Sequence, residues 1–221
     1  FYMGTTEVTQ EVAEELLGSI SAPSNNIGSG AKYPYNASSW HENAYLANLV
    51  TDTHNDTHGS TLEHCYDCDD NGSSVECYPN QNPYLCDGYR LPTSAEWEYA
   101  ARSGTTNDFW TGNGSTDGGD YDSDECSSSV TINDSVFTSL QDFAWFCGNQ
   151  NSNTYTTLTK PVAQKLPNGF GLYDMHGNVS ERTTEWTYQD FSSFDFPAQY
   201  ANPYQFDEWG DHAIIRGGNG G

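Results

Sequence analysis

Two carboxylates, Asp174 and Glu181, lie on either side of a Gly177-Asn178 turn in the run Asp-Met-His-Gly-Asn-Val-Ser-Glu. Calcium takes about six to eight oxygen ligands, which carboxylates and the backbone carbonyls of a turn can supply together. The run therefore predicts a calcium site. His176 does not suit a transition metal here, because one imidazole beside hard oxygen ligands is a poor set for such an ion. We interpret it as a structural or exposed residue.

A second acidic run, Asp67-x-Asp69-x-Asn71-Gly72, matches the first half of an EF-hand loop. The glutamate expected at about the twelfth position of that loop is missing, because Tyr78 stands there. The cysteines on either side of this run favour a hairpin instead. We do not predict calcium binding at this loop.

The chain has 6 cysteines, an even number in an acidic chain rich in Asn and Ser, which favours disulfides in an oxidising compartment. A hairpin turning at Gly72-Ser73 would place Cys68 opposite Cys77. The other predicted pairs are Cys65 with Cys86, which closes a wider loop, and Cys126 with Cys147. Zinc is the competing interpretation, because Cys65-x-x-Cys68 has ligand spacing. The chain lacks a matching second pair, so disulfides are favoured.

Three helices with recognisable starts have to position these residues. Thr9 can cap a segment whose apolar residues share one face and which ends at Gly18. A capping box at 39–42 begins a second helix that continues through Val50, and another at 93–96 begins a third that ends at Gly104. Trp97 and Ala101 are four residues apart in the third helix and should be buried together.

Elsewhere the chain is rich in Gly, Asn, Ser, Asp and Pro, which indicates long loops. Residues 103–124 form a polar surface loop, and short strands are expected at 143–146, 160–163 and 212–216. His54, His58 and His64 fall in an Asn- and Thr-rich stretch of poor helix formers, and we interpret them as solvated loop residues. The fold class predicted from this pattern is an irregular α+β domain.

Composition restricts the function classes. The 221 residues fit one domain, 1–221, and 14% of them are aromatic, so a core built on Trp, Tyr and Phe is feasible. The formal charge of -24 repels nucleic acid and anionic membranes. No segment is long and apolar enough to span a membrane. A protein or glycan ligand, or further copies of the chain itself, remain as partners.

Two runs carry a resemblance to a known family. Gly88-Tyr-Arg-Leu-Pro-Thr-Ser-Ala-Glu-Trp-Glu-Tyr-Ala-Ala-Arg102 and Pro167-Asn-Gly-Phe-Gly-Leu-Tyr-Asp-Met-His-Gly-Asn-Val179 resemble motifs of the formylglycine-generating-enzyme/sulfatase-modifying-factor (FGE-sulfatase) family. The resemblance implies a C-type-lectin-like fold from Thr6 to Gly218. It also implies that family sequence normally precedes and follows this stretch, so we expect the N- and C-terminal flanks to lie outside the chain.

The same resemblance implies a calcium ligand set. In the family the matching positions provide two side chains and two backbone carbonyls, which carry over to Asp174, Gly177, Val179 and Glu181. Relatives usually read Gly-Asn-Val-Trp-Glu-Trp, whereas this chain has Ser180 and Arg182 in place of the two tryptophans. The ligand positions are kept, and the packing around them differs.

Family membership does not settle catalysis. The formylglycine-generating branch binds copper(I) through a cysteine pair that follows an Arg-Gly-Gly-Ser-Trp motif. Here Arg216-Gly-Gly is followed by Asn219-Gly-Gly, and all the cysteines lie upstream. An iron-binding histidine triad, as in the ergothioneine-type branch, is not apparent. The chain therefore has no predicted catalytic residues, and copper is not expected.

The favoured function is a non-catalytic, calcium-stabilised binding or assembly module that is extracellular, periplasmic or displayed on a cell surface. The fold is also used by variable binding proteins of diversity-generating retroelements, whose variable residues lie near the C-terminal end. Tyr204, Phe206 and Trp209 could form such a surface, although ordinary core packing explains them equally well. The alternatives are a copper oxidase whose cysteines lie outside this sequence and a subunit of an extracellular filament.

Overall fold

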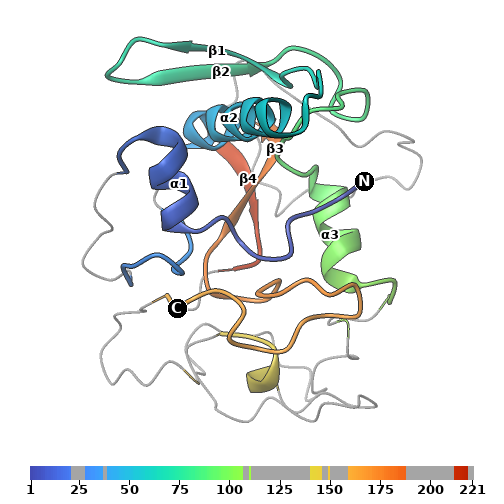
Figure 1. Ribbon diagram of the computed structural model, residues 1–221. Coiled ribbons are helices and arrows are strands. Elements are labelled where there is room, and N and C mark those ends of the chain that lie inside the picture. The colour runs from blue at the N-terminus through green and yellow to red at the C-terminus, as the bar shows by residue number, and fades with distance from the viewer. Residues whose placement is uncertain are drawn as a thin grey trace. The chain divides into compact units, whose positions relative to one another are not determined.

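Helices and short strands alternate with long loops, which makes this an α+β protein, as predicted. The computed structural model describes residues 1–20, 28–36, 39–106, 110, 140–145, 149, 159–187 and 212–218. Their elements are α1 (Gln10–Leu17), α2 (Trp40–His58), β1 (Tyr66–Asp70), β2 (Val75–Pro79), α3 (Ser94–Arg102), the 3-10 turn η1 (Leu140–Asp142), β3 (Glu181–Thr187) and β4 (His212–Arg216) (Figure 1). Strand β1 pairs with β2, and β3 pairs with β4. No helix among these residues meets the length and hydropathy needed to cross a membrane.

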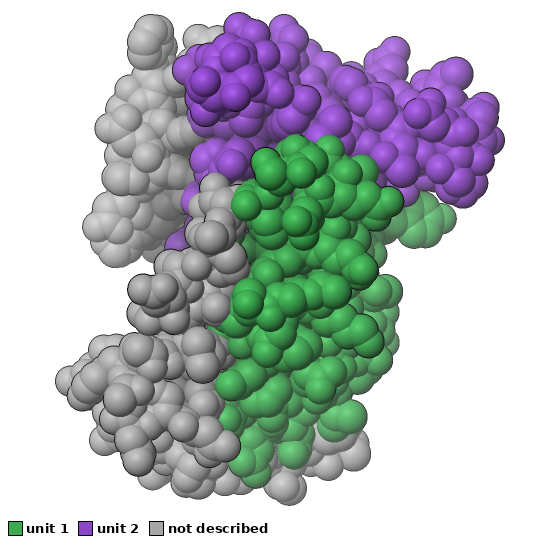
Figure 2. Space-filling model, turned by 60° about the vertical axis from the view of Figure 1, so that its left-hand side comes forward, with its two compact units in different colours: residues 1–37, 98–181, 217–221 green, residues 38–97, 182–216 purple. Residues whose placement is uncertain are grey.

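The chain folds into two compact units, each assembled from segments far apart in the sequence (Figure 2). Unit 1 comprises residues 1–37, 98–181 and 217–221, and unit 2 comprises residues 38–97 and 182–216. The predicted calcium-binding run belongs to unit 1, and four of the six cysteines belong to unit 2. The assignment of 1–221 to one domain remains a prediction.

Helix α1 begins and ends where the capping residues predict, and α2 begins where its capping box predicts. Thr9 accepts a hydrogen bond from the Val12 N–H, and Gly18 ends α1 in the left-handed conformation. The capping box at Ser39 and Glu42 starts α2 with hydrogen bonds of 3.1 and 2.7 Å. These bonds satisfy backbone donors that the first helical turn leaves without a partner.

The end of α2 corrects the sequence prediction. The helix runs past Val50 to His58, so His54 and His58 lie on a helix and not in a loop. Thr51 is fully buried, and its hydroxyl donates to the Ala47 carbonyl at 3.0 Å. Burial thus outweighs the weak helix propensity of this stretch. Gly59 then ends the helix with φ 65°.

The hairpin formed by β1 and β2 confirms the first cysteine prediction. The strands are antiparallel with Cys68 opposite Cys77, and these two cysteines form a disulfide. Cys65 forms the second disulfide with Cys86, and their Cα atoms are 5.7 Å apart. Disulfides therefore use the residues that zinc would have required. Cys126 and Cys147 lie outside the described residues, so the third pairing remains a prediction.

The turn of this hairpin uses the oxygens of its own acidic run. The Asp70 carboxylate accepts from the Gly72 N–H at 2.8 Å, and the Asn71 side-chain oxygen accepts from the N–H groups of Ser73 and Ser74. The run is therefore a tight turn, as the sequence predicts.

Trp40 is the centre of the core of unit 2. This core also contains Ala44 of α2 and the bridged cysteines, and the hairpin lies alongside α2 (Figure 1). The Trp40 ring meets Tyr66 edge-on at 5.4 Å, and its indole N–H donates to the Thr183 carbonyl at 2.9 Å. The Tyr66 hydroxyl accepts from the Leu91 N–H, and burial raises the pKa of Tyr66 to about 12. The disulfides thus attach the hairpin to an aromatic core.

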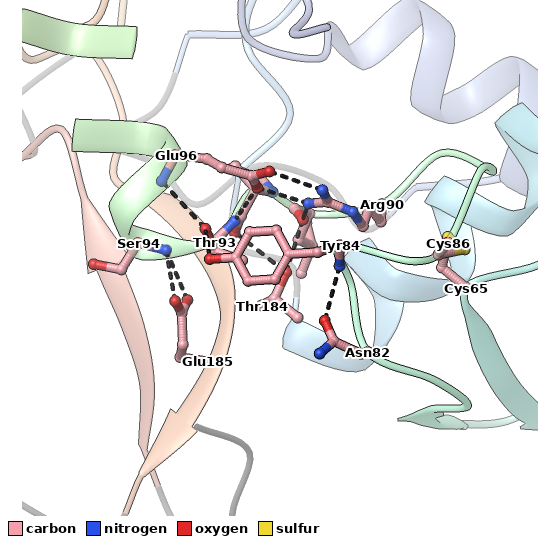
Figure 3. Close-up of polar contacts among 12 residues, drawn as sticks. Cys65, Asn82, Tyr84, Cys86, Arg90, Thr93, Ser94, Glu96, Thr184 and Glu185 are labelled. Atoms are coloured by element: carbon pink, nitrogen blue, oxygen red, sulfur yellow. Dashed lines mark hydrogen bonds and ion pairs between the residues drawn. A yellow bond between two sulfur atoms is a disulfide. The ribbon is translucent and has the colours of Figure 1, made fainter. Parts of the chain in front are cut away.

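The start of α3 carries a capping box and a buried ion pair (Figure 3). Thr93 and Glu96 exchange hydrogen bonds of 2.8 and 3.2 Å, and Arg90 reaches both oxygens of Glu96 at 2.7 and 2.8 Å. Burial alone would raise the pKa of Glu96, but the hydrogen bonds from Arg90 and Thr93 lower it below its usual value. Trp97 and Ala101 are buried, as predicted. The first family-like run, Gly88 to Arg102, therefore has a structural role at the start of α3.

Two of the three predicted strands are wrong. Among the described residues of 143–146, only Trp145 makes a bridge, an isolated one to Gly177. Residues 160–163 form a turn, with Ala163 at φ 58°. The strand at 212–216 is confirmed as β4, and its partner β3 was not predicted.

Candidate calcium site

The run from Asp174 to Val179 folds as a turn with an unusual backbone. Asp174, Gly177 and Asn178 have φ values of 56°, 92° and 62°, in the left-handed region. The Gly177 N–H donates to the Gly217 carbonyl at 2.8 Å. A Cβ atom on Gly177 would lie 1.8 Å from the Trp145 carbonyl oxygen, so only glycine fits at this position. The sequence Gly177-Asn178 thus provides the turn that the calcium prediction requires.

Asp174 is buried with only part of its hydrogen bonding satisfied. Its side chain is 1% exposed, and Oδ2 accepts from the Ala163 N–H at 2.7 Å. Oδ1 is buried and has no hydrogen-bond partner within the part of the chain that the structure describes. Burial raises the pKa of this carboxyl above its ordinary value. A carboxylate oxygen left without a donor is costly, and a cation would relieve that cost.

Glu7, from the N-terminal segment, is a candidate site residue that the sequence did not reveal. Its Oε1 accepts from the Val179 N–H at 3.2 Å, and its Oε2 accepts from the Asn178 side chain at 2.8 Å. Burial, followed by the negative charges of Glu181 and Asp174, raises the pKa of Glu7 from 4.5 to about 9. A third carboxylate therefore joins the two predicted ones.

Asn178 connects Glu7 to the segment on the other side of the turn. Its side-chain oxygen accepts from the Lys160 N–H at 2.8 Å, and its side-chain N–H group donates to both Glu7 and the Lys160 carbonyl. The side chain is 3% exposed, and its three contacts leave it no freedom to rotate. Asn178 therefore positions Glu7.

The donor set fits calcium. It contains three carboxylates and a turn rich in backbone carbonyls, all hard oxygen ligands. His176 is held in its uncharged form, because burial and the positive charge of Arg102 lower its pKa to about 4. Its ring meets Phe143 edge-on at 5.8 Å, as expected of a structural residue. Among the described residues no three acidic, histidine or cysteine side chains form a ready-made metal cluster. The charges of Asp174 and Glu181 act on Glu7, but the three carboxylates do not form a complete coordination shell.

Without calcium, the stability of the protein should fall as pH rises from about 4.5 to about 9. The folded state binds the Glu7 proton more tightly than the unfolded state does, because the folded pKa is about 9 and the ordinary value is 4.5. The stability that this proton contributes is then fully present below the ordinary pKa. It is lost as the pH rises to the folded pKa. Glu7→Gln should flatten this dependence, measured as thermal midpoint against pH in a chelator.

The matched control for that measurement is Glu14→Gln, which removes the same charge from an exposed position of α1. The slope of its thermal midpoint against pH should equal that of the wild-type protein. Equal slopes for wild type and Glu7→Gln would contradict the placement of Glu7 among the other two carboxylates.

The remaining predicted site residues, Tyr204, Phe206 and Trp209, lie outside the described residues.

An α+β domain with long loops, bridged cysteines and a buried, oxygen-rich turn is characteristic of the C-type-lectin-like fold. The chain belongs to the FGE-sulfatase family, since the pattern of the sulfatase-modifying factor enzyme 1-like domain matches residues 1–220. Both family-like runs lie within this match.

Curated relatives differ in their named functions. The chain is 31% identical over 196 residues to chaperone protein LppX of Paenibacillus barcinonensis, covering 84% of this chain and 62% of that protein. It is 32% identical over 133 residues to the formylglycine-generating enzyme of Thermomonospora curvata, covering 60% of this chain and 38% of the enzyme. The chain thus spans less than two thirds of the length of either relative.

A solved structure supports the same fold. Treponema denticola variable protein 1 superposes with a TM-score of 0.61 and 25% identity, over 96% of this chain and 70% of that protein.

Proposed function

We propose that the chain is a non-catalytic, calcium-stabilised binding or assembly module of the FGE-sulfatase family. The observation that carries the proposal is the set of carboxylates around the Gly177 turn. Asp174 has an unpartnered buried oxygen, and the charges of Glu181 and Asp174 act on the half-buried Glu7. Three acids in one partly buried place need a counter-charge, and calcium suits their hard oxygens. The ion would be held by Glu7, Asp174 and Glu181 with the carbonyls of Gly177 and Val179.

The cysteines favour a structural role over copper chemistry. Copper-dependent oxidation of a substrate in this family uses free thiolates. All four described cysteines are in disulfides. Arg216 of the Arg-Gly-Gly motif is also used within unit 2, where its guanidinium donates to the Ser94 hydroxyl. These residues support the fold and are not available for redox chemistry.

The relatives favour binding of another macromolecule. A relative whose match covers 84% of this chain is named a chaperone, a name that suggests binding to another protein. Disulfides point to an oxidising compartment, and a charge of -24 favours basic or cation-bridged partners. A secreted or surface-displayed protein-binding module fits these three observations.

Enzyme assays on the full-length gene product test the proposal. The protein is incubated with copper, oxygen and a cysteine-containing sulfatase peptide, and mass spectrometry follows conversion of the peptide cysteine to the aldehyde. We expect no conversion above the no-protein control, with the Thermomonospora curvata enzyme as the positive control. A thiol count on the unfolded, unreduced chain should find all six cysteines blocked. Peptide turnover, or two free thiols that bind copper, would show an oxidase instead.

A further inference from the structure

Two histidines at the end of α2 form a pair that the calcium site does not involve. His54 and His58 are four residues apart in a helix that ends at Gly59. Residues four apart lie on one helix face. Their imidazole rings are stacked, with centroids 4.4 Å apart and planes tilted by 23°. His54 is half-buried, and His58 is exposed. The pair is therefore ordered by the helix and accessible from solvent.

Hydrogen bonds indicate which nitrogen of each ring is available to bind an ion. The His58 Nδ1 lies 3.1 Å from the His54 carbonyl oxygen. Because a carbonyl only accepts, Nδ1 carries the proton and Nε2 keeps its lone pair. The His54 Nδ1 lies 3.2 Å from the Tyr89 hydroxyl, which can accept from the same tautomer. Hydrogen bonding of the second ring nitrogen is the usual support for a metal-binding histidine.

We propose that His54 and His58 form a two-histidine site for a divalent transition-metal ion such as zinc, nickel or copper. Neutral imidazole nitrogens suit these ions, and paired histidines one turn apart on a helix are an established way to hold zinc. The negative end of the helix dipole and the acidic chain both favour a cation at this position.

The remaining ligands come from water or from a bound partner. The described residues hold no group of three metal-ligating side chains. The nearby Asp52 is already paired with His64, whose Nε2 is 2.7 Å from the Asp52 carboxylate. The site thus offers two protein ligands and open coordination positions. A histidine, carboxylate or carbonyl from a partner could fill them.

Calorimetric titration with zinc chloride tests the site. The intact protein is kept in excess calcium, so that hard-oxygen sites are already filled. We expect one zinc ion to bind, and His54→Gln or His58→Gln to weaken that binding by roughly 100-fold, since each removes one arm of a chelate. Glutamine is a good helix former, so the helix should persist in both variants, as circular dichroism checks.

His64→Gln is the matched control, because it removes a histidine of the same unit that is already bound to Asp52. It should leave the zinc affinity unchanged. Hydrogen exchange gives a second measurement: zinc should slow exchange of the amides of 55–58 in the wild type and not in the His54→Gln/His58→Gln double variant. Zinc affinity that survives in the double variant, or that falls equally in His64→Gln, would overturn the proposal.

Discussion

Calcium at about a thousandfold excess over its Kd is expected to raise the free energy of unfolding by about 4.1 kcal/mol. For a chain of this length that corresponds to a rise in thermal midpoint of roughly 10 °C. The cause is the charge that the ion neutralises, because Asp174 is buried with one unpartnered oxygen and the charges of Asp174 and Glu181 act on Glu7. The measurement is a pair of melting curves, one in calcium and one in a chelator.

Asp174→Asn should abolish the calcium-dependent rise, because the substitution removes a charged ligand and keeps an oxygen that can accept from Ala163. Asp69→Asn is the control. It makes the same chemical change at an exposed position in the acidic run that resembles half of an EF-hand. Its rise should match the wild type. If Asp69→Asn loses the rise while Asp174→Asn retains it, calcium binds the hairpin instead.

An ion at this turn would tie together parts of unit 1 that are distant in sequence. Glu7 and Val179 are 172 residues apart, and the adjacent Tyr173 N–H donates to the Thr5 carbonyl at 2.9 Å. Closing so long a loop costs chain entropy. Without a cation, Glu7 holds a proton up to a pKa of about 9, and an ion bound to all three carboxylates would offset the cost of ionising it. Calcium bound as proposed would therefore act in this fold as a cross-link for the N-terminal segment.

Local signals explain what the sequence could predict. Capping residues act within about one turn of a helix, so the starts of α1, α2 and α3 could be read from Thr9, Ser39 and Thr93. Cysteine spacing and the Gly72 turn similarly predicted the hairpin and both described disulfides. Asp174 and the turn at Gly177 are local as well.

Non-local contacts explain what the sequence could not predict. Glu7 joins the site through bonds to residues 171 and 172 positions away, and no spacing rule reaches that far. The last part of α2 is stabilised by burial of Thr51, which propensity does not include. Ala163 has φ 58°, in the left-handed region, and its N–H donates to Asp174. The run 160–163, which resembles a strand in the sequence, therefore contacts the candidate site instead.

Gly177→Ala is expected to destabilise the protein by more than about 3 kcal/mol and to remove calcium binding. Two costs add. An L-residue in the left-handed region at φ 92° is strained, and its Cβ would meet the Trp145 carbonyl oxygen at 1.8 Å. The turn would have to move, which would break the 2.8 Å hydrogen bond to Gly217 and displace the Val179 N–H from Glu7.

Gly171→Ala separates the two costs. Gly171 has φ 81°, close to that of Gly177, but an added Cβ would have no atom of the described residues within 4 Å. The free energy of unfolding of this variant should therefore fall only by the cost of backbone strain, about 1 kcal/mol. The variant should keep its full calcium-dependent rise in thermal midpoint. Urea unfolding in calcium and in a chelator measures both quantities. Equal losses in the two variants would mean that the Trp145 carbonyl does not confine the turn, and the geometry proposed for the calcium ligands would then fail with it.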